Sequence, residues 1–78
     1  MEVEPAHSLA HVRGEARRYF EEMLGMEPEP TTNSDSMMFT GDDGYVRIEF
    51  TDHAGPARVL LHSKEFEHEL REFARIIA

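Results

Sequence analysis

The sequence predicts an α+β domain with the order α-β-β-β-α, in which a three-stranded antiparallel meander carries both helices on one face. Three observations support this class. Apolar residues recur at helical spacing near both ends of the chain, they alternate with polar residues in the middle, and glycine-rich turns separate the alternating runs. At 78 residues, the chain has room for one small domain, residues 1–78.

The first helix is expected over residues 8–24, preceded by residues 1–7 as a frayed N-terminus. Gly25 is suited to end this helix in a left-handed conformation, with Met26 folding back as the next apolar contact. The apolar positions that share one side of the helical wheel are Leu9, Val12, Ala16, Phe20 and Met23.

Residues 27–35 are predicted to form an exposed, proline-rich connector between the first helix and the first strand, because prolines and small polar side chains interrupt regular structure. The segment from Gly41 to Gly44 encloses two aspartates and is typical of a tight hairpin turn, in which Gly44 can adopt a positive φ. Residues 52–56 are expected to form a second turn.

Three strands are predicted, over residues 37–40, 45–51 and 57–62, with the register of the first left open. The second and third strands alternate, so each has one apolar and one mixed face. The inward positions are Val46, Ile48, Phe50, Ala57, Val59 and Leu61.

The last helix is expected to begin at Ser63, a favourable N-cap residue, with Glu65 in its first turn. Its buried stripe is Phe66, Leu70, Phe73 and Ile77.

The charge balance argues against several classes of function. Sixteen acidic and eight basic residues give a formal net charge of −8, which opposes binding to nucleic acid and to anionic membranes. There are no cysteines, so disulfides and thiol nucleophiles are excluded. The first residues are acidic and lack an apolar run, so we expect a cytoplasmic protein without a membrane anchor.

No metal site, cofactor or catalytic group is predicted, and the chain is expected not to be an enzyme. Glu65 and His68 have a spacing used in di-metal helical bundles, but His68 falls opposite the buried stripe. His7 and His11 are one helical turn apart and could bind zinc only with further ligands, so a surface pair without metal is favoured.

Two surfaces are predicted to bind a partner. The outer sheet face carries Tyr45, Arg47, Arg58 and Leu60, residue types that protein interfaces favour, although such a face can also simply be hydrated. The second surface is a basic ribbon on the last helix, which serves either an acidic partner or the charge balance with nearby glutamates. The ribbon consists of Lys64, His68, Arg71 and Arg75.

We therefore expect a small acidic, non-catalytic protein-interaction module that self-associates as a homo-oligomer or joins a larger assembly. The element order resembles that of the double-stranded RNA-binding domain over most of the chain. In place of that family's lysine cluster, this helix begins Lys64-Glu65-Phe66-Glu67. The resemblance implies an alternative, nucleic-acid association through the basic ribbon.

Overall fold

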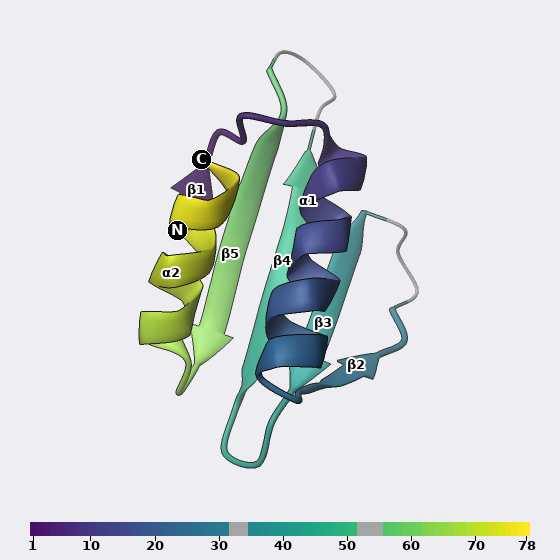
Figure 1. Cartoon of the computed structure of the whole chain (residues 1–78), viewed down its shortest axis with the longest axis vertical. Helices are drawn as coiled ribbons and strands as arrows, with labels where there is room; N and C mark the ends of the chain where they lie inside the picture. The colour runs from purple at the N-terminus through teal and green to yellow at the C-terminus, as the bar shows by residue number, and fades with distance from the viewer. Residues whose placement is uncertain (32–34, 52–55) are drawn as a thin grey trace.

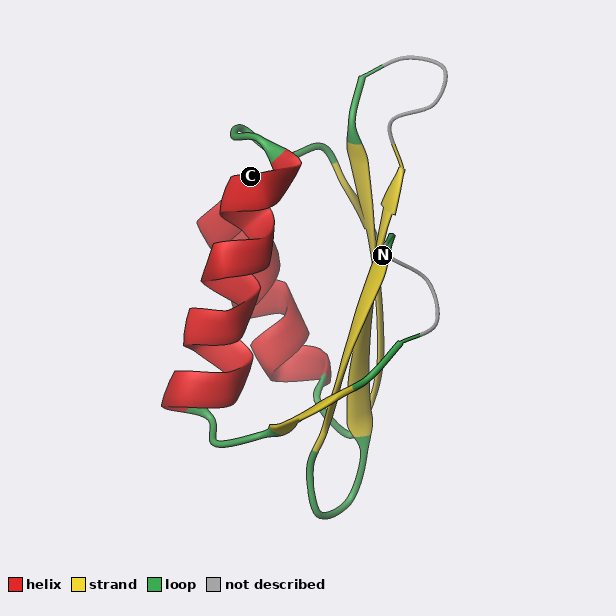
Figure 2. Cartoon of the chain, turned by 90° about the vertical axis from the view of Figure 1, so that its right-hand side faces the viewer, coloured by secondary structure: helices red, strands yellow, loops and turns green. Residues whose placement is uncertain are grey.

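The computed structural model describes residues 1–31, 35–51 and 56–78. It is an α+β fold of two layers, a five-stranded antiparallel sheet and a helical layer that covers one of its faces (Figures 1 and 2). The strand order across the sheet is β1-β5-β4-β3-β2. The strands are β1 (Glu2–Val3), β2 (Glu27–Glu29), β3 (Ser36–Thr40), β4 (Tyr45–Thr51) and β5 (Arg58–Lys64).

The predicted three-stranded meander corresponds to β3, β4 and β5, but the sheet is wider than predicted. Residues 1–7, expected to be frayed, instead provide β1, which pairs with β5. Residues 27–35, expected to be a connector, provide β2, which pairs with β3. Both added strands form hydrogen bonds with backbone groups that would otherwise be unpaired at the edges of β5 and β3. Backbone pairing of this kind does not require a pattern of apolar side chains, so the apolar pattern of the sequence does not predict it.

The first helix begins where the sequence predicts. The side chain of Ser8 accepts a hydrogen bond from the amide of His11 at 3.2 Å and caps α1 (Leu9–Ala16). The helix then continues as the π-helical segment η1 (Arg17–Met23). Gly25 has the predicted left-handed conformation, with φ of 68°, and the following Met26 is buried.

The prediction that Met23 belongs to the buried stripe is wrong, because this side chain is 68% exposed. A π-helical turn contains more residues than an α-helical one, so the stripe rotates away from the core towards its end. Tyr19 and Phe20 then both contact the core, and the Phe20 ring centroid lies 5.0 Å from that of Phe73 and 5.6 Å from that of Phe39.

The last helix starts later than predicted. Ser63 lies opposite Val46 within β5, and α2 (Glu67–Ile77) follows Phe66, which provides no side-chain cap. The pairing of β5 with β4 therefore takes precedence over the capping signal at Ser63. Glu65 then turns the chain with a positive φ of 70° and lies outside the helix. The predicted stripe is otherwise correct: Leu70, Phe73 and Ile77 are buried and Phe66 is partly buried.

The β3–β4 hairpin forms as predicted, with the amide of Gly41 donating to the carbonyl oxygen of Gly44 at 2.9 Å. Gly44 does not adopt the predicted positive φ. It is required for a different reason, because a Cβ atom there would overlap the carbonyl oxygen of Lys64. The second predicted turn, residues 52–56, falls mostly outside the described residues. Neither helix in the described part of the chain has the length and hydrophobicity needed to cross a membrane.

Candidate functional site

The candidate site is the outer face of the sheet, the face turned away from the helices. Figure 2 shows both helices on one side of the sheet and none on the other. The predicted inward residues Val46, Ile48, Phe50, Val59 and Leu61 are buried beneath the helices. Ala57, also predicted inward, precedes β5 and is half-buried, as is Ser63, which is paired with the inward Val46. The four residues predicted for the outer face, Tyr45, Arg47, Arg58 and Leu60, all occupy the opposite set of positions.

Side chains on this outer face form rows, because residues paired across antiparallel strands point to the same side. Each row runs across the sheet from one strand to the next. From β2 to β5, the first row is Glu27, Thr40, Tyr45 and Lys64, and the second row is Glu29, Met38, Arg47 and His62. From β3 to β1, the third row is Ser36, Glu49, Leu60 and Glu2.

The two arginines on the outer face are held by neighbouring carboxylates. Arg47 Nε lies 3.1 Å from a carboxylate oxygen of Glu49. Arg58 Nε lies 3.3 Å from Glu2, and its Nη1 lies 3.4 Å from Glu4, so Arg58 joins β5 to the N-terminal segment. Solvent-exposed pairs of this kind contribute up to about 1 kcal/mol each. These arginines therefore stabilise contacts within the sheet.

The two ends of the first row carry opposite charge, and the second row has a glutamate at one end and a histidine at the other. Lys64 and His62 are exposed on β5, whereas Glu27 and Glu29 are exposed on β2. Within the described ranges, neither Lys64 nor Glu27 takes part in an ion pair. Glu29 accepts a hydrogen bond from Thr40 Oγ1 at 2.9 Å. In the first and second rows the β2 end of the outer face is thus acidic and the β5 end carries Lys64, whereas the edge strand β1 beyond β5 carries the exposed Glu2.

The predicted basic ribbon is divided by the structure. His68, Arg71 and Arg75 are exposed on α2, on the helical side of the sheet, and Arg75 lies 3.5 Å from Glu72. Lys64 belongs to β5 and lies beside Tyr45 in the first row. The eight predicted partner-binding residues therefore occupy two separate surfaces, five on the outer face and three on α2.

The sequence reasoning missed the acidic edge of the outer face, Glu27 and Glu29. Two prolines in this segment favoured a connector over a strand. The signal that could have revealed it is the alternation Glu27-Pro28-Glu29-Pro30, which has the two-residue period of a strand. Met38 was also left unassigned, because the register of its strand was open.

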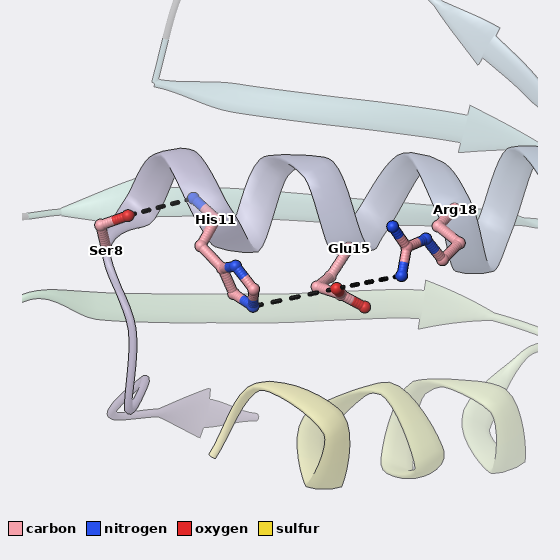
Figure 3. Close-up of polar contacts among 4 residues, drawn as sticks. All are labelled: Ser8, His11, Glu15 and Arg18. Carbon is pink, nitrogen blue, oxygen red and sulfur yellow. Dashed lines mark hydrogen bonds and ion pairs between the residues drawn. The ribbon is translucent and has the colours of Figure 1, made fainter.

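On the helical side, His11, Glu15 and Arg18 form a line of polar contacts along the first helix (Figure 3). Glu15 lies 3.8 Å from His11 Nε2 and 3.6 Å from Arg18 Nη1, and the rings of His7 and His11 are 4.4 Å apart. Among the described residues, no group of three or more histidines and carboxylates is placed to hold a metal ion. A hollow of about 580 Å³ lies beside the β3–β4 hairpin, and four carboxylate side chains line it. These four carboxylates are not placed to hold a metal ion either.

Tyr19 lies between the two helices, where its environment opposes ionisation. Partial burial raises the pKa of its hydroxyl above the usual 10.0, and the nearby carboxylates Glu69 and Glu72 raise the pKa further. The neutral phenol is the form that this site favours, which fits its contact with the aromatic ring of Phe73.

No protein-family model, curated protein or solved structure matches this chain.

Proposed function

We propose that this protein is a small interaction module without catalytic activity, and that it binds a protein partner through the outer face of its sheet. One observation carries the proposal. Met38, Tyr45 and Leu60 are half-buried on three adjacent strands of a sheet face that has no helix over it. Tyrosine, methionine and arginine are enriched at protein interfaces, and this face combines all three.

The size of the domain gives a second reason to expect a partner. A chain of 78 residues buries a smaller share of its surface than a larger domain does, and its stability margin is correspondingly thin. A partner that binds only the folded state stabilises it, by an amount that grows with the partner's concentration relative to its dissociation constant. Covering Met38, Tyr45 and Leu60 removes apolar surface from water and adds to this effect.

A non-catalytic role accords with how the polar groups of this face are used. Arg47 and Arg58 are paired with carboxylates, and the hydroxyl of Thr40 donates to Glu29. These contacts join polar groups within the sheet and do not converge on a common point where a substrate atom could be held.

The alternative, nucleic-acid association, has weaker support. It now rests on His68, Arg71 and Arg75, because Lys64 lies on the outer face of the sheet. Three basic positions on a chain with net charge −8 offer little of the counterion release that drives such binding. We therefore do not advance it as the function.

The proposal is tested by site-specific photocrosslinking of the full chain in cells. A photoreactive amino acid replaces Tyr45 on the outer face, and a matched control replaces the exposed Arg71 on α2. We expect ultraviolet light to produce a defined covalent adduct with a protein at position 45 and none at position 71. An adduct at position 71 alone, or none at either position, would contradict the proposal.

A further inference from the structure

The edges of the sheet are poorly suited to adding another chain. β2, at one edge, contains Pro28 between two glutamates and is followed by Pro30. β1, at the other edge, has two residues. Short strands, prolines and charged side chains are the features that block strand addition at a sheet edge. Association is therefore directed to the outer face rather than to the edges.

The first row of this face has opposite charges at its two ends, and the second row has a glutamate at one end and a histidine at the other. In the first row, Glu27 lies on β2 and Lys64 on β5, with two neutral residues between them. In the second row, Glu29 and His62 occupy the same two ends. The charged ends are three strand spacings apart, about 14 Å, so they are too distant to pair within one chain.

We propose that the partner on the outer face is a second copy of this chain, related by a two-fold axis that runs along the strands between β3 and β4. This inference rests on the proposed function and specifies its partner. The axis places each row over its own image in reverse order. Lys64 then faces the partner's Glu27, and His62 faces the partner's Glu29. At the centre, Tyr45 faces the partner's Thr40.

A two-fold axis across the strands fails on charge. It lays each strand over its own image, so the basic side chains of β5 meet each other and the acidic side chains of β2 do the same. Like charges facing each other at an interface are unfavourable. The axis along the strands pairs opposite charges twice, once on each side of the symmetry axis, as an isologous contact requires. It also matches the nearly aligned packing of sheets in a sandwich.

The area of the face predicts a weak dimer. The strands β2, β3, β4 and β5 have three, five, seven and seven residues, and each residue covers about 16 Å² of sheet. The face therefore measures roughly 350 Å² for each protomer and roughly 700 Å² for the pair, which is below the size of standard specific interfaces and in the range of weak contacts. The net charge of −8 on each protomer also opposes association. At about 0.15 M salt this general repulsion is screened beyond about 8 Å, whereas pairs in contact are less affected.

The test uses sedimentation equilibrium and native mass spectrometry of the untagged full chain, from about 10 µM to about 1 mM, where small interfaces associate. Wild type is expected to dimerise in this range. Lys64→Glu and Glu27→Lys each create two like-charge contacts in their own homodimer, so each alone is expected to weaken dimerisation about tenfold or more. Arg71→Glu makes the same charge change on α2 and is expected to have little effect.

Mixing the two single variants provides the decisive measurement. When Lys64→Glu meets Glu27→Lys, both facing contacts become opposite in charge again, and the total charge of the pair equals that of the wild-type pair. We expect equal amounts of the two variants to form heterodimers with nearly wild-type affinity. This recovery also shows that both variants are folded.

Two outcomes would overturn the inference. The first is a wild-type protein that stays monomeric throughout the concentration range. The second is a wild-type dimer whose two variants show no recovery on mixing, since the dimer would then use another surface. If position 45 crosslinks to a different protein while the chain is monomeric, the inference fails but the proposed function stands. If position 45 gives no adduct and the chain is monomeric, both fail.

Discussion

The two faces of the sheet are built from the same strands and yet follow different rules. The inner face is mainly apolar and is covered by α1, η1 and α2, whereas the outer face mixes charged, polar and half-buried apolar side chains. Leu60 and Leu61 show the contrast most directly, because they are neighbours in β5 and point to opposite faces. Leu61 is 1% exposed, and Leu60 is half-buried beside Glu49 and Glu2.

The contrast indicates that the inner face determines the fold, whereas the residues of the outer face are less restricted by folding. A buried side chain without a good fit costs stability directly, so the inner face is restricted to residues that fill the space beneath the helices. The outer face tolerates ion pairs such as Arg47 with Glu49, which contribute little to folding. Its composition can therefore reflect binding more than folding.

The largest expected effect is a difference in stability between alanine substitutions of Leu61 and Leu60. Leu61→Ala should lower the free energy of unfolding by about 2–5 kcal/mol, because it leaves a cavity in the core. Leu60→Ala should lower it by about 1 kcal/mol in the monomer, since less apolar surface is lost. Urea denaturation at low micromolar concentration measures both, with Leu61→Val as a milder variant. Equal losses from the two alanine substitutions would erase the distinction between the faces.

A smaller loss of stability is expected from a substitution of Gly44, at the end of the sheet that carries Lys64. Gly44→Ala places a Cβ atom against the carbonyl oxygen of Lys64, so β5 must shift, at a cost of about 1–3 kcal/mol. Gly14→Ala is the matched control, because no atom beyond its chain neighbours and the backbone of its own helix lies within 4 Å of its Cβ position, and alanine favours the helix by about 1 kcal/mol. Thermal unfolding should show opposite shifts in Tm. A stable Gly44→Ala variant would contradict this close approach.

The smallest effect concerns Tyr19, on the helical side. Because its pKa is raised in the folded protein, the unfolded chain releases this proton first as the pH rises above about 10. The free energy of unfolding should therefore fall in this alkaline range, and Tyr19→Phe should remove that part of the fall. Urea denaturation at about pH 8 and about pH 11 compares the two proteins, which share all other titrating groups. Parallel losses in both would show that Tyr19 does not contribute.

The inner face was predictable from the sequence because its signal is a repeated apolar pattern. The alternation in β4 and the helical stripe in α2 each involve several residues, so a single ambiguous position does not obscure them. The edge strands were not predictable in this way. Glu2–Val3 and Glu27–Glu29 are short and mostly exposed, and their pairing depends on the edges of β5 and β3, which come later in the chain.

The candidate site was partly predictable for the same reason. Tyr45, Arg47, Arg58 and Leu60 follow from alternation once the inner face is known. Lys64 was misassigned because Ser63 is a good N-cap residue locally, whereas pairing with β4 extends β5 past it. Local capping preferences of about 1 kcal/mol are readily exceeded by strand pairing and the contacts that accompany it.

The pairing of β1 with β5 has a consequence for the order in which the chain can fold. The amide of Leu61 donates to the carbonyl oxygen of Met1 at 2.7 Å, across a sequence separation of 60 residues. Contacts this distant in sequence carry a higher loop-closure entropy than the hairpin closed by residues 41–44. During synthesis, the segment that forms β1 is made before β5, and it finds its partner only after β5 has been made. The edge beside β5 is therefore the last part of the sheet to close.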